Sequence, residues 1–162
     1  MYQICKATES ELPRILQIYA EARDFMRRSG NPNQWKTHHP ATQLLLEDIA
    51  RQQLYLCMEG NEIQAVFAYI PGIDPTYLHI YEGQWCNDAP YGVIHRIAVA
   101  RQGRGVAAAC FDWALEQCRN LRIDTHRDNL PMQRALDKYG FRYCGIIYLQ
   151  NGEERLAFQK TV

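Results

Sequence analysis

Two hydrophobic periods run along this chain of 162 residues. Apolar residues that recur every three or four positions line one face of a helix, and apolar residues at every second position line one face of a strand. In the first half, these patterns predict a strand over 2–6, a helix from 12 that ends at 27–30, a helix over 41–52, and an antiparallel hairpin of strands 54–58 and 62–70. The turn formers at 31–40 predict a loop that carries one Trp and two His.

The second half predicts a strand over 93–99, a helix over 106–118, a strand over 121–125, a helix from 131 to about 138, and two strands over 141–149 and 153–160. Asn151-Gly152, between the last two strands, is a strong signal for a two-residue hairpin turn. The segment 73–92 has no clear period, and its residues 77–81 fit either a strand or a helical turn. Two hairpins exclude a wholly parallel sheet, so we expect a mixed sheet in one domain.

The turn at 101–105, with glycines at 103 and 105, separates a strand from a helix that has no acidic residue in its first turn. Free backbone N–H groups and the helix dipole favour an anion at such a helix start. Glycine lets the backbone approach a ligand closely because no Cβ stands in the way. The sequence therefore predicts that a phosphorylated ligand binds over residues 102–107.

Composition excludes several classes of function. Acidic and basic residues number 18 each, which gives a formal net charge of zero and argues against a nucleic-acid partner. No apolar run is long enough to span a membrane, and the N-terminal residues lack the pattern of a signal peptide. The six cysteines form no C-x-x-C pair and fit reduced thiols better than a disulfide framework. We expect a cytoplasmic protein with no membrane or nucleic-acid partner.

The glycine turn fits two motifs in different frames. Residues 103–108 fit the dinucleotide pattern G-x-G-x-x-G/A, and Asp124 lies at a suitable offset to hold a ribose. A dinucleotide fold needs further strand–helix–strand units, however, and this chain ends in an antiparallel hairpin soon after the motif. In the second frame, residues 102–107 fit the pattern Q/R-x-x-G-x-G/A. The order of the surrounding elements favours the second frame.

That second pattern resembles the pyrophosphate-binding loop of the GNAT superfamily of acyl-CoA-dependent N-acetyltransferases. The order of predicted elements is similar to this family along the whole of 1–162. A further similarity is the segment 129–141, which has an Asn before a short helix and Gly140-Phe141 after it. The resemblance implies a single α/β (α+β) domain with a mixed, mainly antiparallel central sheet flanked by helices. It also implies acetyl-CoA as cosubstrate.

The resemblance implies where acetyl-CoA binds. In the family, the strand before the loop parts from its neighbour and binds the pantetheine arm, and the corresponding residues here are Ile97, Ala98 and Val99. The residues that would hold the pyrophosphate on backbone N–H groups are Gln102, Gly103, Arg104, Gly105, Val106 and Ala107. Asn129 would contact the cofactor, cap the following helix, or do both.

Acyl transfer to an amine needs a proton acceptor for the amine and an acid for the departing thiolate. The family commonly uses a Tyr as this acid, but Leu136 occupies the corresponding position here. Tyr139 is an alternative acid on the same helix, although packing of its ring would explain it equally well. Cys144 and an ordered water are further alternatives.

Polar residues elsewhere are candidates for the acceptor side. His95 and Arg96 are consecutive in a strand, so their side chains are expected on opposite faces, with one of them at the substrate. His95 suits a base at neutral pH, and a structural hydrogen-bonded His is the alternative. Glu82 is a second candidate, as a base or an amine-binding carboxylate, and Tyr81 beside it is a candidate substrate contact. Their alternative is a surface loop.

Gln34 and Trp35 lie in the loop between the first two helices, which borders the acceptor site in the resembled fold. Packing of the Trp35 ring against the core is an equal alternative. His38-His39 and His126 have no partners at metal-ligand spacing, so we expect no metal.

We therefore predict an N-acetyltransferase that moves the acetyl group of acetyl-CoA to a primary amine of a small molecule or peptide by direct attack in a ternary complex. The alternative is a non-catalytic domain that binds acyl-CoA and acts as a sensor or interaction module. The acceptor and the oligomeric state stay open, and pairing of the terminal hairpin across a homodimer is one option, by analogy with related folds.

Overall fold

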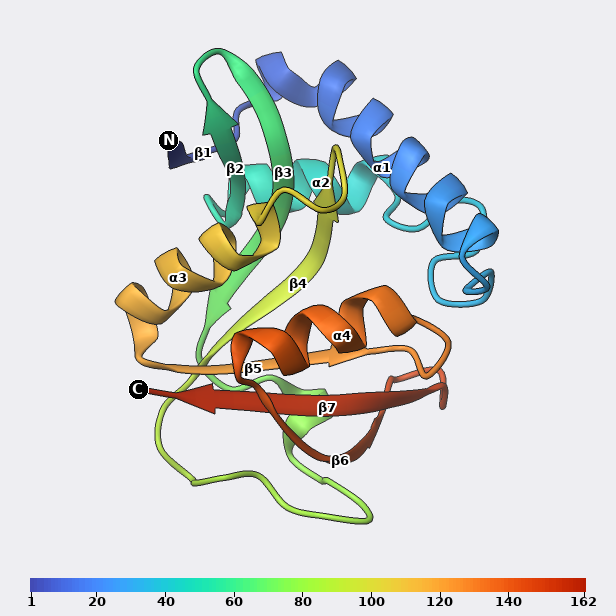
Figure 1. Cartoon of the computed structure of the whole chain (residues 1–162), viewed down its shortest axis with the longest axis vertical. Helices are drawn as coiled ribbons and strands as arrows, with labels where there is room; N and C mark the ends of the chain where they lie inside the picture. The colour runs from blue at the N-terminus through green and yellow to red at the C-terminus, as the bar shows by residue number, and fades with distance from the viewer.

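A seven-stranded sheet organises the chain, and the computed structural model describes all residues, Met1–Val162 (Figure 1). The strands lie in the order β1 (Tyr2–Lys6), β2 (Leu54–Glu59), β3 (Glu62–Pro71), β4 (Gly92–Val99), β5 (Asn120–Thr125), β7 (Glu154–Thr161) and β6 (Arg142–Tyr148). Every neighbouring pair is antiparallel except β4 and β5, which are parallel. The prediction of a mixed, mainly antiparallel sheet flanked by helices is confirmed.

Helices cover both faces of the sheet (Figure 1). On one face, the α1/α2 face, lie α1 (Leu12–Arg28) and α2 (Thr42–Ala50), and on the other, the α3/α4 face, lie α3 (Val106–Cys118) and α4 (Leu130–Tyr139). Two short 3₁₀ turns are η1 (Glu9–Glu11), before α1, and η2 (Pro75–Tyr77), after β3. All predicted helices and strands are present, with bounds shifted by a few residues at most. The terminal strand β7 lies inside the sheet, so β6 forms that edge.

Two apolar clusters fix the helices on the sheet. On the α3/α4 face, Phe111 and Leu136 are buried against strand residues such as Phe67. On the α1/α2 face, Ile15 of α1 and Leu45 of α2 are fully buried in the same way. Burial of one such side chain contributes about 1.5–3 kcal/mol, so packing and not helix propensity holds these elements. No helix is both long enough and apolar enough to cross a membrane.

The connection between β3 and β4 has one regular element, η2, and side chains of the sheet hold the rest of it. The guanidinium of Arg122 lies between two rings of this connection, 4.1 Å from the centroid of Trp85 and 4.0 Å from that of Tyr91. Its Nη2 also donates a hydrogen bond to the Asn87 carbonyl, 2.8 Å away. Cation–π and hydrogen-bond contacts therefore hold the connection against β5. These contacts do not follow from any periodic pattern in the sequence.

The two central strands part soon after they meet. β4 and β5 pair only through Gly92 with Leu121 and Val93 with Arg122. Beyond these pairs β4 turns away from β5, which Figure 1 shows as a widening gap between the two ribbons. The edge of β4 that faces the gap has no strand partner there.

A bulge in β4 accompanies this separation. Between the pairs Ala68–His95 and Val66–Ala98, one residue of β3 lies opposite two residues of β4. Arg96, one of the two, has a left-handed backbone with φ of 54°. Such a conformation is unfavourable for a non-glycine residue and needs support from its surroundings.

The support for Arg96 comes from the α1/α2 face. Its guanidinium forms a bidentate ion pair with Asp48 of α2, with Nε 3.0 Å from Oδ2 and Nη2 2.9 Å from Oδ1. The Tyr19 hydroxyl donates to the Arg96 carbonyl at 2.7 Å. The extra residue of the bulge brings the side chains of both His95 and Arg96 to one cavity. The prediction that only one of these two side chains faces the substrate side is wrong, because strand alternation fails at the bulge.

We expect Asp48→Ala to lower the free energy of unfolding by about 3–5 kcal/mol, because it leaves a buried guanidinium without its counter-charge. The matched control is Asp24→Ala, which removes an exposed partner of Arg27 and Arg28 on α1 and should change little. Urea denaturation followed by circular dichroism measures both. Similar small losses in the two variants would contradict the supporting role of Asp48.

Candidate active site

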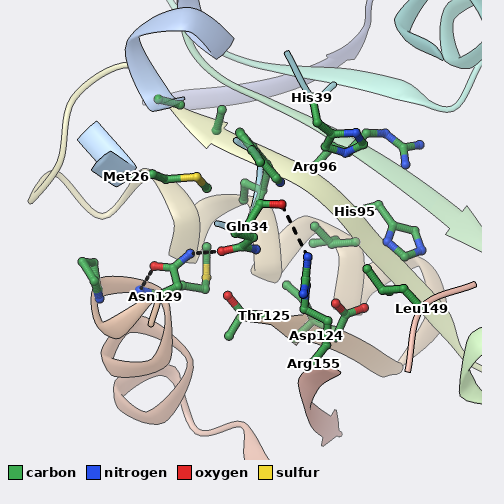
Figure 2. A pocket seen from close by; sticks show the side chains of 18 of the residues that line it. Met26, Gln34, His39, His95, Arg96, Asp124, Thr125, Asn129, Leu149 and Arg155 are labelled. Carbon is green, nitrogen blue, oxygen red and sulfur yellow. Dashed lines mark hydrogen bonds between the residues drawn. The ribbon is translucent and has the colours of Figure 1, made fainter. Parts of the chain in front are cut away.

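A cavity of about 490 Å³ lies where β4 and β5 separate (Figure 2). From the α3/α4 face, the glycine turn and the start of α4 contribute lining residues. From the α1/α2 face, the end of α1, the loop at 31–40, the η2 turn and the β6–β7 hairpin contribute them. The cavity therefore passes through the gap between the two strands and connects the two faces of the sheet.

The glycine turn lies at the α3/α4 end of this cavity. Gly103 and Gly105 have φ of 78° and 71°, in the left-handed region, and neither would have a neighbouring atom within 4 Å of an added Cβ. The backbone N–H groups of residues 102–108 donate to no other group of the protein. Of the predicted loop residues, Gln102 and Ala107 line the cavity, while residues 103–105 form the turn beside it and Val106 begins α3. Seven free donors at a helix start can hold an anion.

The gap itself is lined by the parted ends of the strands. Ile97, Ala98 and Val99 of β4 all line it, and their contact with the pantetheine arm stays a prediction. Across the gap, Thr125 ends β5, and its side chain is 1 % exposed. The Thr125 Oγ1 has no hydrogen-bond partner in the protein, which is rare for a buried hydroxyl and indicates a place for a polar ligand group.

Asn129 and Gln34 connect the start of α4 to the loop at 31–40. Asn129 caps α4, since its Oδ1 accepts from the Met132 N–H at 3.1 Å. Its Nδ2 donates to the Gln34 Oε1 at 2.9 Å, a contact drawn in Figure 2. Both side chains line the cavity, and so does the buried Trp35, whose ring packs edge-on against Tyr19. The loop is thus fixed over the cavity by hydrogen bonds and aromatic packing.

His95 lies on the α1/α2 side of the gap and is paired with a carboxylate. Its Nε2 is 2.8 Å from the Asp74 Oδ2, and both side chains are largely buried. Burial alone would raise the pKa of Asp74, but hydrogen bonds from His95 and Thr76 outweigh it and lower this pKa to about 2. An ionised carboxylate fixes the orientation and the tautomer of the imidazole. The pair can therefore accept a proton from a group in the cavity.

Asp124 is a second carboxylate on this side. Its Oδ2 accepts a hydrogen bond of 2.6 Å from the hydroxyl of the buried Tyr77, and its Oδ1 has no partner in the protein. Burial raises the pKa of Asp124, although the nearby charge of His95 and the Tyr77 hydrogen bond oppose this. Figure 2 shows Asp124 between Arg155 and His95. The free oxygen is available to a donor within the cavity.

A cationic group lies on the neighbouring strand, where β7 begins after the β6–β7 hairpin turn. Arg155 is 5 % exposed, and its Nη2 lies 3.2 Å from the Glu153 Oε2 and 3.4 Å from the Gln34 carbonyl. Lys36 of the loop at 31–40 shares Glu153, with its Nζ 3.1 Å from Oε1. Burial and the charges of Arg96 and Arg155 lower the pKa of the adjacent His39 to about 4. This part of the cavity is therefore electropositive.

Three predicted site residues lie outside the cavity. Tyr139 is at the far end of α4, where its hydroxyl hydrogen-bonds to Asp112 and its ring packs against Phe111 and Phe141. Glu82 and Tyr81 are exposed in the β3–β4 connection and do not line the cavity, and Tyr81 pairs with Ile146 and packs edge-on against Tyr148 on the edge strand β6. The structure does not bring these three to the other candidates.

Four functional candidates of the cavity were not identified from the sequence. Asp74 and Thr125 had no distinguishing motif, and Asp124 was considered only as a ribose ligand in the rejected dinucleotide frame. Arg155 follows the predicted Asn-Gly turn and carried no signal of its own. The Asp-Pro dipeptide at Asp74 is typical of a helix start and could have placed that carboxylate at η2.

Comparison with known proteins identifies the fold family. The model of the acetyltransferase (GNAT) family matches residues 14–141. The structure of a GNAT-family acetyltransferase from Streptococcus agalactiae is similar to this chain, with 33% identity, a TM-score of 0.91 and coverage of 99% of this chain and 95% of that chain. No protein with a curated description matches the sequence.

Two further structures share the fold at lower identity. A GNAT-family acetyltransferase from Listeria monocytogenes has 17% identity, a TM-score of 0.72 and coverage of 99% of this chain and 95% of that chain. The structure of yncA from Salmonella typhimurium, which holds acetyl-CoA as its cofactor, has 13% identity, a TM-score of 0.65 and coverage of 99% and 93%.

Replacement of Asp74 by Asn should change how stability depends on pH. The folded pKa of about 2 lies below the unfolded value of about 3.9, so the carboxylate stabilises the fold above pH ~4 and this stabilisation is lost as pH falls through ~2. The shift corresponds to about 2.5 kcal/mol, of which about 1 kcal/mol is lost between pH 5 and pH 3. Urea denaturation should show wild type losing about 1 kcal/mol more than Asp74→Asn over this interval. Equal losses in the two proteins would show that Asp74 is not held ionised by its partners.

Proposed function

Because this chain belongs to the GNAT family of acetyltransferases, we propose that it is an N-acetyltransferase that uses acetyl-CoA to acetylate a primary amine by direct attack. Family membership supports acyl transfer in general. The amine acceptor and the roles of individual residues are the proposal. The observation that carries it is the cavity through the β4–β5 gap, which has free amides at one end and a carboxylate–histidine pair at the other.

The α3/α4 end of the cavity suits the coenzyme. The pyrophosphate would accept hydrogen bonds from the free N–H groups of the turn at 102–107, with left-handed glycines at 103 and 105 allowing close approach. The pantetheine arm would lie along Ile97, Ala98 and Val99. The unpaired Thr125 hydroxyl fits this assignment, because a polar group of the arm or thioester would satisfy it. Asn129 caps α4 and also lines this cavity.

His95 is the proposed proton acceptor on the other side of the gap. In the reaction, the amine nitrogen forms a C–N bond to the acetyl carbon, the C–S bond breaks, and the nitrogen loses one proton. His95 would take that proton, and Asp74 would act as a positioning residue by holding the imidazole through its 2.8 Å contact. A backbone N–H on the parted edge of β4 would stabilise the developing oxyanion.

The leaving thiolate must gain the proton that the amine loses. No tyrosine lines the cavity, and Leu136, at the position where the family commonly has Tyr, is fully buried in the core. Tyr139 faces Asp112, and Cys144 lies next to Cys86, so neither is available at the thioester. We propose that protonated His95 gives its proton to the sulfur, so that one imidazole accepts the proton from nitrogen and delivers it to the leaving thiolate.

The missing Tyr favours one alternative function. A domain that holds acyl-CoA without turnover would need the same turn and gap but no acid at the thioester. Such a sensor would bind acetyl-CoA and release no CoA with any amine, so a turnover assay separates the two functions.

We expect His95→Gln to lower kcat by about 10²–10⁴-fold and leave the Kd for acetyl-CoA unchanged, because it removes the proton acceptor but none of the coenzyme contacts. The measurement is release of free CoA with an amine that the wild type accepts, with coenzyme binding followed by calorimetry. The matched control is His79→Gln, an exposed histidine outside the cavity that should keep full kcat.

Two results would overturn these assignments. An unchanged kcat in His95→Gln would remove His95 from the chemistry. Tight binding of acetyl-CoA by the wild type with no CoA release across amines, amino acids, polyamines and peptides would favour the non-catalytic alternative.

A further inference from the structure

The acceptor side of the cavity carries opposite charges on two neighbouring strands, with Asp124 on β5 and Arg155 on β7. We propose that the acceptor is a small primary amine that also bears a carboxylate, an amino acid or a close derivative, with its ammonium at Asp124 and its carboxylate at Arg155. This inference rests on the proposed acetyltransferase function and names the substrate class of the same site. Four observations carry it.

The first observation is the incomplete pairing of Asp124. Tyr77 donates to one carboxylate oxygen, and the other has no partner in the protein although the side chain lines the cavity. Both Asp124 and His95, the proposed proton acceptor, line the cavity, and the charge of His95 is near enough to lower the pKa of this carboxyl. An ammonium group held by the free oxygen of Asp124 would first release one proton to solvent, and the amine so formed would be close to the imidazole that takes its second proton during the transfer. Because an ammonium is itself charged, its hydrogen bond to this oxygen is about twice as strong as one between neutral groups.

The second observation is the incomplete pairing of Arg155. Its contacts with the Glu154 carbonyl, the Gln34 carbonyl and Glu153 use at most three of its five N–H donors. Glu153 is shared with Lys36, so two cations stand against one anion on this wall. A buried guanidinium with free donors and surplus positive charge favours a carboxylate ligand, which it can bind with paired hydrogen bonds.

The third observation is the electropositive field around this wall. The nearby His39 is kept neutral well into the acidic range by burial and by the charges of Arg96, Arg155 and Arg23, with a pKa of about 4. Arg96 forms an ion pair with Asp48, whereas Arg155 and Lys36 share one ion-pair partner, Glu153. A second ammonium group of a diamine would meet this field and be repelled.

The fourth observation is how the loop at 31–40 and the β6–β7 hairpin are joined. Lys36 of the loop contacts Glu153 of the hairpin, and Arg155 of the hairpin contacts the Gln34 carbonyl of the loop. An extended peptide that runs out of the cavity between these two segments would have to break both contacts. Apolar side chains of Phe25, Met26, Trp35 and Leu149 line the same chamber. A compact amine with a carboxylate and an apolar side chain fits these walls.

The step balances as ordinary amide formation. The unprotonated amine of the amino acid attacks the acetyl carbon, the C–N bond forms and the C–S bond breaks. The proton lost by nitrogen passes through His95 to the sulfur of CoA. The carboxylate at Arg155 takes no part in the bond changes and acts only by positioning the amine.

The test compares amino acids with their amides as acceptors. Leucine, methionine and phenylalanine are each matched with leucinamide, methioninamide and phenylalaninamide, and putrescine serves as a diamine. CoA release with the wild type should give a kcat/KM at least tenfold higher for each acid than for its amide or for putrescine. Because the amine of an amide is less basic and more often unprotonated, its intrinsic reactivity biases the comparison against this result.

A substitution at Arg155 should remove the preference. In Arg155→Gln, the ratio of kcat/KM between acid and amide should fall towards one, mainly through a higher KM for the acids. The matched control is Arg127→Gln, which removes an exposed partner of Glu154 outside the cavity and should keep the ratio. The acid–amide comparison on the wild type needs no variant, so it decides the question even if Arg155→Gln does not fold.

Each outcome separates the two levels of the proposal. If amides or putrescine are acetylated as well as the acids, the carboxylate site at Arg155 is refuted and the acetyltransferase function stands. If the acids are preferred but Arg155→Gln keeps that preference, Arg155 is not the group that holds the carboxylate. If no amine releases CoA, the acetyltransferase function is refuted and the acceptor class with it.

Discussion

The separation of β4 from β5 is the constraint on which the rest of the structure depends. Two parallel strands with only two paired positions leave backbone edges unpaired in the middle of a protein, which is costly unless something else binds them. The bulge at Arg96 accompanies the separation, and the buried ion pair with Asp48 holds the bulge in an unfavourable backbone conformation. The gap is therefore maintained by packing on the α1/α2 face, at a distance from the glycine turn.

This gap divides the chemistry between the two faces of the sheet. Free amides and an unpaired threonine hydroxyl lie towards the α3/α4 face, where a phosphorylated coenzyme suits them. Paired carboxylates, a histidine and a buried arginine lie towards the α1/α2 face, where they suit a small charged acceptor. The β3–β4 connection contributes Asp74 and Tyr77 to this second group, and Arg122 fixes that connection through two aromatic rings.

The order of elements and the glycine turn could be predicted from sequence because both depend on local patterns. Hydrophobic period, capping residues and turn residues act over a few positions, and they predicted every helix and strand. The side chains at the acceptor side could not be predicted in this way. The bulge at Arg96 depends on Asp48, which lies 48 residues earlier, and it brings His95 and Arg96 to one side against the normal alternation. Asp74 reaches His95 from a connection without a period, and Arg155 approaches Gln34 across 121 residues.

Hydrogen exchange with and without coenzyme A tests the central claim, that the gap and the glycine turn form one coenzyme site. The N–H groups of residues 102–108 donate to nothing in the protein, so a bound pyrophosphate should slow their exchange, and the arm should slow that of residues 97–99. The turn between β2 and β3 should exchange at the same rate in both states. Unchanged exchange across 97–108 with saturating coenzyme A, or protection confined to another part of the chain, would contradict the account.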